Sequence, residues 1–135
     1  MLAASGNDGS SRVEYPAAFA GVLAVGATNR NGTVASYSTR GTALDLVAPG
    51  GDSSASEANG ILSTVFDDSS GTAKAGYAFY DGTSMATPHA AGVAALVIAA
   101  RPGLTPAQVE AILLGSARDL GTAGRDDTYG HGLVD

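Results

Sequence analysis

The chain has 135 residues, of which 44% are hydrophobic and 19 are glycine, a composition that predicts one globular, loop-rich α/β domain or part of one. The seven Lys and Arg residues are scattered and the net charge is −6, which argues against a nucleic-acid-binding surface. Cysteine is absent, which excludes disulfide and thiolate chemistry. No apolar run approaches the roughly 20 residues of a membrane span, so we expect no membrane segment.

The first four residues, Met1-Leu2-Ala3-Ala4, are apolar and run directly into Ser5-Gly6-Asn7. This pattern predicts the last part of a buried parallel strand. A signal peptide would carry a basic region and a longer apolar core, and neither is present. We therefore expect the chain to begin inside a strand.

Four further short apolar runs are bounded by Gly, Pro, Asn and Asp, as strands are. They cover residues 23–28, 44–48, 61–65 and 77–80. The Gly- and Ser-rich stretch 50–59 predicts a loop and not an interdomain linker.

Two helices are predicted in the second half of the chain. From residue 84 to about residue 100 the side chains are small or apolar on nearly every face, which predicts a buried central helix. Thr105-Pro106-Ala107-Gln108 is a capping-box sequence with proline at the first helical position. An apolar stripe follows it, so we expect a surface helix that ends near Gly115.

The segment Asp81-Gly82-Thr83-Ser84 places a serine at a glycine-led turn that runs into the first of these helices. Unpaired N–H groups and the positive end of the helix dipole stabilise a developing anion at such a position. This is the setting of a nucleophile. The alternative is a capped, buried helix with Thr83 or Ser84 as its N-cap.

The order of residues 82–92, Gly-Thr-Ser-Met-Ala-Thr-Pro-His-Ala-Ala-Gly, closely resembles the nucleophile signature of the subtilisin-like serine proteases, the subtilases. Further segments resemble the family in the same order: residues 3–9, 15–16, 25–28, 35–38, 44–50 and 129–135. The resemblance implies that residues 1–135 form the C-terminal part of a subtilisin-like three-layer α/β domain, with a mainly parallel sheet and a buried central helix.

The activity that this resemblance implies is that of a serine-type endopeptidase, which cleaves peptide or protein substrates through an acyl-enzyme. Ser84 is then the nucleophile, and Asn7 donates to the oxyanion together with the Ser84 N–H. The alternative for Asn7 is a structural role, because residues 6–9, Gly-Asn-Asp-Gly, are also a good turn sequence. The resemblance also implies substrate-binding roles for five residues: Ser5, Gly6, Asp8, Glu14 and Thr83.

Glu14 falls at the base of the family's pocket for the residue before the scissile bond, and Asp8 falls at the rim of that pocket. Two carboxylates there favour a basic or polar substrate residue. The alternative is that Glu14 is solvated and neutral to specificity.

Subtilases use an aspartate, a histidine and a serine in that order, and only the serine end is present. Both histidines, His89 and His131, follow Ser84. At about 100° per residue His89 faces away from Ser84, and we expect it to be a packed, hydrogen-bonded structural residue. His131, between two glycines, is expected in a turn or closing strand. The base and its carboxylate are therefore expected from a missing N-terminal half, and the chain alone is expected to be inactive.

The resemblance implies no required cofactor. Backbone carbonyls of Ala17, Phe19 and Val22 fall where family members bind a structural cation, Ca²⁺ or Na⁺. Family resemblance also places the full-length protein outside the cell or in the cell envelope. The alternative function is a non-catalytic remnant or pseudoenzyme that binds peptides or a partner chain.

Overall fold

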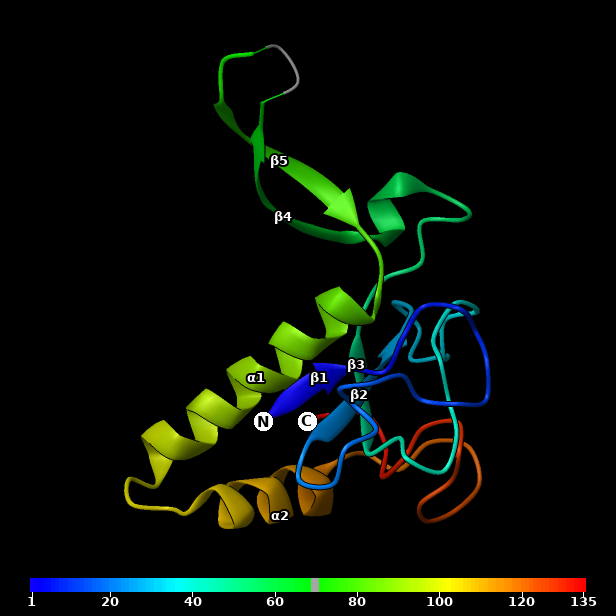
Figure 1. The fold of residues 1–135 in the computed structure, drawn as a ribbon, viewed down its shortest axis with the longest axis vertical. Helices are drawn as coiled ribbons and strands as arrows, with labels where there is room; N and C mark the ends of the chain where they lie inside the picture. Colours follow the sequence, from blue (N-terminus) through cyan, green and yellow to red (C-terminus); the bar gives the residue numbers. More distant parts are fainter. Residues whose placement is uncertain (69–70) are drawn as a thin grey trace.

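The computed structural model describes residues 1–68 and 71–135. Three strands form a parallel sheet, two more form a separate hairpin, and two helices follow (Figure 1). In chain order the elements are β1 (Leu2–Ala4), β2 (Leu23–Thr28), β3 (Leu46–Pro49), the 3₁₀ turn η1 (Glu57–Asn59), β4 (Ile61–Asp67), β5 (Lys74–Tyr80), α1 (Thr83–Ala100) and α2 (Pro106–Ser116).

The parallel sheet has the order β1-β2-β3, with Leu2 opposite Leu23 and Val25 opposite Leu46. All six residues of β2 are buried because this strand lies in the centre. The strand predicted at residues 23–28 is confirmed to the residue, and the strand expected at the start of the chain is present. Strand β1 pairs with β2 alone and leaves its other edge without a strand among the described residues.

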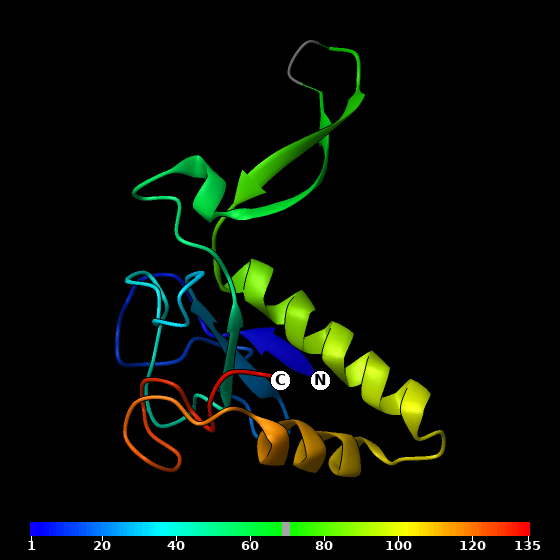
Figure 2. The ribbon, with the colours of Figure 1, turned by 180° about the vertical axis from the view of Figure 1, so that it is seen from behind.

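Alternate side chains of the sheet enter two different clusters, as the two-residue period of a strand requires. On one face Val25, Leu46 and Ala90 meet in a cluster that includes both helices. On the other face Ala24 and Val47 lie against irregular segments around Val13, Leu44 and Leu133. Within the described part of the chain, the helices therefore cover only one face of the sheet (Figures 1 and 2).

Helix α1 is buried along a single stripe of four residues at helical spacing: Thr83, Ala86, Ala90 and Ala94. The expectation of burial on nearly every face is wrong for this chain, because no described segment covers the opposite side. Leu96, for example, is 70% exposed. The N-cap is Gly82, which makes no side-chain cap bond, so the alternative with Thr83 or Ser84 as N-cap is also wrong.

The same helix bears on the expectation that the chain has no membrane segment. Residues 83–100 form a helix of 18 residues with mean hydropathy 1.3, long and apolar enough by length and composition to cross a membrane. Core helices of soluble proteins pass the same test. Since α1 contacts all three strands of the parallel sheet and α2, we assign it to the core.

Helix α2 follows its prediction closely. The side chain of Thr105 accepts from the Gln108 N–H at 3.3 Å, and Gln108 Oε1 accepts from the Thr105 N–H at 2.8 Å. Both halves of the capping box are therefore formed. Buried Val109 and Leu113 hold the helix against the sheet cluster.

Residues 129–134 brace the outer edge of β3. Val47 donates to the carbonyl of Gly132, and Val134 donates back to the carbonyl of Val47, both at 2.9 Å. A Cβ at Gly130 would lie 2.3 Å from the Asp45 carbonyl oxygen, so no larger residue fits there without displacing the backbone. The closing segment is thereby fixed against the sheet.

Strands β4 and β5 form an antiparallel hairpin that projects away from the rest of the molecule (Figures 1 and 2). Both strands are longer than predicted from the sequence, because polar and small residues at their outer ends continue the pairing as far as Asp67 and Lys74. Strand β5 then leads directly into the turn before Ser84.

We predict that Leu113→Ala lowers the free energy of unfolding by about 2–5 kcal/mol, since Leu113 is 1% exposed and joins α2 to the sheet. The matched control is Leu96→Ala, which removes the same atoms from an exposed position and should cost less than about 0.5 kcal/mol. Urea unfolding followed by circular dichroism measures both. Equal losses for the two variants would contradict the assigned core.

Candidate active site

Ser84 is the second residue of α1 and its side chain is exposed. Within residues 1–68 and 71–135 its hydroxyl has no hydrogen-bond partner. In the first turn of α1 the Thr83 N–H donates to Asn7 and the Met85 and Ala86 N–H groups donate to the Gly82 carbonyl, whereas the Ser84 N–H has no acceptor among the described residues. Ser84 is therefore presented to solvent together with its own free N–H group, an arrangement that suits a nucleophile.

Asn7, which follows β1, reaches the start of α1 across 76 positions of sequence. Its Oδ1 accepts from both the backbone N–H and the hydroxyl of Thr83, each at 2.9 Å. Because Oδ1 is occupied by these two donors, the Nδ2 group remains as the donating end of the amide. The structure thus brings together three of the predicted site residues: Asn7, Thr83 and Ser84.

The turn that carries Ser84 packs directly against Gly50, the residue that follows β3. The Gly82 N–H donates to the Gly50 carbonyl at 3.0 Å. A Cβ on Gly50 would lie 2.4 Å from the Cβ of Ala27 and 2.8 Å from the Gly82 carbonyl oxygen. Only glycine therefore allows the end of β3 to approach the nucleophile turn this closely.

Tyr37 fixes the position of Gly50, a role that the sequence did not reveal. Its hydroxyl lies 3.1 Å from the Gly50 carbonyl oxygen and 2.7 Å from that of Gly51. Burial, with a further contribution from the charge of Asp81, raises the pKa of Tyr37 to about 12. The hydroxyl therefore remains a donor at neutral pH. Tyr37 lies in one of the family-like motifs, but that motif alone does not indicate what it contacts.

The predicted substrate-binding residues before β2 gather around Thr39. Ser5 is buried and donates to the Thr39 carbonyl at 2.8 Å, so its hydroxyl has a structural partner. The Thr39 hydroxyl donates to Asp8 Oδ1 at 2.6 Å. This bond and further ones from Ser10 lower the pKa of Asp8.

Glu14 is exposed and its carboxylate lies against Gly6. A Cβ at Gly6 would meet Glu14 Oε1 at 2.5 Å and the Thr39 hydroxyl at 2.8 Å. The following peptide bond, Tyr15–Pro16, is cis. The two carboxylates expected at one pocket, those of Glu14 and Asp8, are thus grouped around Gly6 and Thr39.

Neither histidine is bonded to Ser84 in the described part of the chain. His89 Nδ1 lies 2.8 Å from the Met85 carbonyl oxygen, so the expectation of a hydrogen-bonded residue is confirmed. The expectation that it is packed is wrong, because His89 is exposed. His131 lies in a turn, as predicted, and its backbone N–H donates to the Asp45 carbonyl.

The three residues of the expected cation site, Ala17, Phe19 and Val22, line a hollow of about 300 Å³ together with Asp45 and Glu110. Carbonyl and carboxylate oxygens are the ligands that hard cations prefer. The donor set therefore suits Ca²⁺ or Na⁺, and binding of either ion stays a prediction. Among the described residues no group of three or more His, Cys, Asp or Glu side chains is placed to hold a metal ion.

Comparison with known proteins extends these observations. The family model described as the subtilase family matches residues 1–132. Alkaline elastase YaB of Bacillus sp. (strain YaB) is 42% identical over 134 residues, which cover 99% of this chain and 31% of that protein. Subtilisin BL of Lederbergia lenta is 41% identical, with coverage of 99% and 43%.

Solved structures of proteases are similar to this chain as well. A lanthipeptide protease superposes with a TM-score of 0.85 at 32% identity, covering 98% of this chain and 47% of that one. A protease from Pseudoalteromonas arctica gives a TM-score of 0.87 at 40% identity, with coverage of 98% and 39%. The chain thus spans less than half the length of these relatives. With the serine turn, the asparagine beside it and the parallel sheet in the expected places, the chain belongs to the subtilase family.

Proposed function

We propose that this chain carries the nucleophile and the oxyanion donors of a serine endopeptidase. The observation that supports this most is the pair of hydrogen bonds from Thr83 to Asn7 Oδ1, which leave the Asn7 Nδ2 group as a donor beside Ser84. An amide donor held beside an exposed serine at a helix N-terminus suits a tetrahedral oxyanion.

In the proposed reaction Ser84 Oγ attacks the carbonyl carbon of the scissile peptide. The serine proton passes to a general base, and the carbonyl oxygen becomes an oxyanion that accepts from Asn7 Nδ2 and the Ser84 N–H. The base returns the proton to the departing amine, which leaves an acyl-enzyme. Water then attacks the ester, and Ser84 is regenerated.

The general base and the carboxylate that orients it are proposed to come from outside residues 1–135. His89 is hydrogen-bonded to the Met85 carbonyl, one turn closer to the N-terminus of the same helix. His131 is held in the closing segment through the Asp45 carbonyl. A serine hydroxyl without a base stays protonated and is a weak nucleophile.

We predict that the chain, expressed as residues 1–135, reacts with a fluorophosphonate probe roughly 10³-fold or more slowly than subtilisin BL does. Ser84→Ala is the control, and circular dichroism establishes that each sample is folded. Size-exclusion chromatography of the same samples reports self-association through the unpaired β1 edge, which we also expect.

Rapid labelling that disappears in Ser84→Ala would show that Ser84 is activated within this chain, and the proposed external base would be wrong. A chimera provides the opposite test. Residues 1–135 replace the matching segment of subtilisin BL, which then supplies the base. An unreactive but folded chimera would favour the alternative of a non-catalytic module.

Asn7→Ala in that chimera should lower kcat by about 10²–10³-fold with little change in KM, a magnitude taken from the equivalent asparagine of subtilisin. The loss falls on kcat because the oxyanion forms only in the transition state. Asn31→Ala, an exposed asparagine in a turn, is the matched control. A change in KM alone would assign Asn7 to ground-state binding.

Substrate preference is proposed to follow from the carboxylates of Glu14 and Asp8, which favour a basic or polar residue before the scissile bond. We predict that Glu14→Gln in the chimera lowers kcat/KM for a lysine substrate relative to a phenylalanine substrate by about tenfold or less, since Glu14 is exposed. Glu57→Gln is the control. An unchanged ratio would mean that Glu14 is solvated and neutral to specificity.

The site of action is proposed to be extracellular. Relatives of this chain include the minor extracellular protease Epr of Bacillus subtilis (strain 168), at 42% identity, and an extracellular protease of Xanthomonas campestris, at 46% identity. The absence of cysteine places no constraint on the redox state of the compartment.

A further inference from the structure

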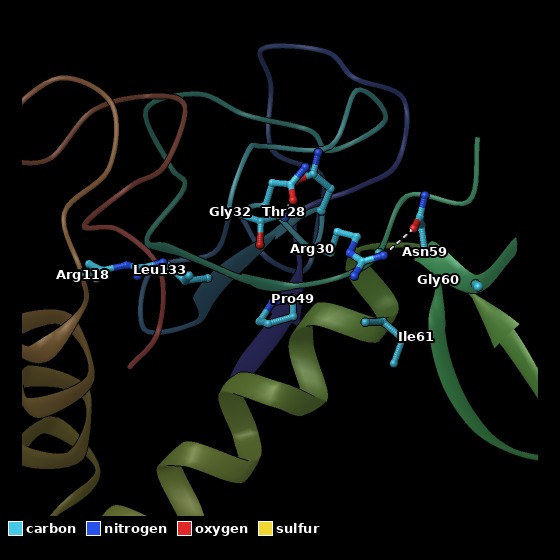
Figure 3. Close-up of a pocket in the computed structure, with 13 residues that line it drawn as sticks. Thr28, Arg30, Gly32, Pro49, Asn59, Gly60, Ile61, Arg118 and Leu133 are labelled. Atoms are coloured by element: carbon cyan, nitrogen blue, oxygen red, sulfur yellow. Dashed lines mark hydrogen bonds between the residues drawn. The ribbon is translucent and has the colours of Figure 1, made fainter. Parts of the chain in front are cut away.

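A hollow of about 390 Å³ lies at the carboxyl ends of β2 and β3, and Ser84 is not among the residues that line it (Figure 3). Thr28 and Pro49, the last residues of these strands, form part of its wall, and Arg30 and Arg118 line it from other segments. The carboxyl ends of parallel strands are a frequent place for ligands in α/β proteins.

The charge of this hollow is opposite to that of the chain. None of its 13 lining residues is acidic, and two of them are arginines. The chain as a whole carries a net charge of −6 and only seven Lys and Arg residues. Two of the few cations therefore face one cavity that contains no compensating carboxylate.

Arg30 is held in a defined orientation at the side of the hollow formed by η1. Its Nη1 donates to Asn59 Oδ1 at 3.1 Å. Within residues 1–68 and 71–135 the guanidinium makes no ion pair, so its remaining N–H groups are free to donate. An arginine that is anchored by one donor and free at the others suits a carboxylate.

Arg118 is anchored through its backbone. Its N–H donates to the Leu133 carbonyl at 2.8 Å, and its own carbonyl accepts from the Leu133 N–H at 2.9 Å. Its guanidinium lies next to Gly32, because Arg118 Nη2 is 3.8 Å from the position that a Cβ at Gly32 would take. Over the described residues the guanidinium itself has neither a hydrogen bond nor an ion pair.

The two guanidinium groups approach from different sides of the hollow, Arg30 beside Asn59 and Arg118 beside Leu133 (Figure 3). A single small anion has one charged centre, whereas an acidic peptide carries several carboxylates along an extended chain. We propose that this hollow binds an acidic polypeptide segment, with one carboxylate at Arg30 and another at Arg118.

The proposed site does not include Ser84, but it adjoins Gly50, against which the turn that carries Ser84 packs. Gly51 lines the hollow, and the N–H groups of Gly50 and Gly51 both donate to the Thr28 carbonyl. Gly50 in turn accepts from Gly82. Binding at the hollow needs no catalysis, so it can be tested independently of the proposed peptidase function.

The test uses the Ser84→Ala chain, shown to be folded by circular dichroism, and a fluorescein-labelled hexaglutamate peptide. Fluorescence anisotropy should show saturable binding that weakens as salt is raised. Arg30→Gln and Arg118→Gln should each weaken binding by about 3- to 10-fold, as the loss of one charge-assisted contact predicts. Arg101→Gln, at an exposed arginine outside the hollow, is the control and should change binding by less than about twofold.

Arg118→Lys provides a second variant that keeps the charge and loses the forked donors, and it should bind between the native and glutamine forms. Absence of saturable binding by the folded chain would overturn the proposal. So would an equal loss in Arg101→Gln, which would indicate a general charge effect. Binding of inorganic phosphate without binding of the peptide would also overturn it, because the site would then hold a single small anion.

Discussion

The hydrogen bonds that join Asn7 to Thr83 are the contact on which the rest of the site depends. They connect the loop after the first strand of the sheet to the first residue of α1, and the two residues are 76 positions apart in sequence. One carboxamide oxygen accepts two donors, which fixes both the rotation of the Asn7 amide and the position of the helix start. The same two hydrogen bonds therefore determine where α1 begins and which end of the Asn7 amide remains free to donate.

Small residues make this contact possible. Gly82 at the N-cap and Gly50 below it bring three backbone segments together with almost no side-chain volume between them. Tyr37 then supplies the hydroxyl that orients the Gly50 and Gly51 carbonyls. A methyl group at Gly50 would lie 2.4 Å from the Ala27 Cβ and 2.8 Å from the Gly82 carbonyl oxygen, so the turn has little room for it.

Local sequence patterns predicted the regular elements well. The strand at residues 23–28 and the capping box at Thr105 depend on nearest neighbours, and both are confirmed. The resemblance also placed Asn7 and Ser84 in one site. Burial of α1 was predicted less well, because small apolar residues such as Ala90 and Leu96 look alike in sequence, whereas their exposure depends on which segments lie against the helix.

The part of the site that sequence did not reveal consists of long-range contacts between unremarkable residue types. Nothing local to Tyr37 indicates that its hydroxyl meets Gly50 and Gly51. Likewise the two arginines of the hollow are 88 positions apart and carry no motif, so only the folded chain places them around one cavity.

The brace formed by residues 129–134 has a consequence for the order in which the protein is made. The outer edge of β3 obtains its hydrogen bonds from Gly132 and Val134, which leave the ribosome after every other element of the fold. Until then Val47 has an unsatisfied N–H and carbonyl on that edge. Because Val47 and Gly132 are 85 positions apart, this edge of β3 gains its hydrogen bonds only after both helices have been synthesised, which makes the pairing a late, non-local step in the folding of this segment.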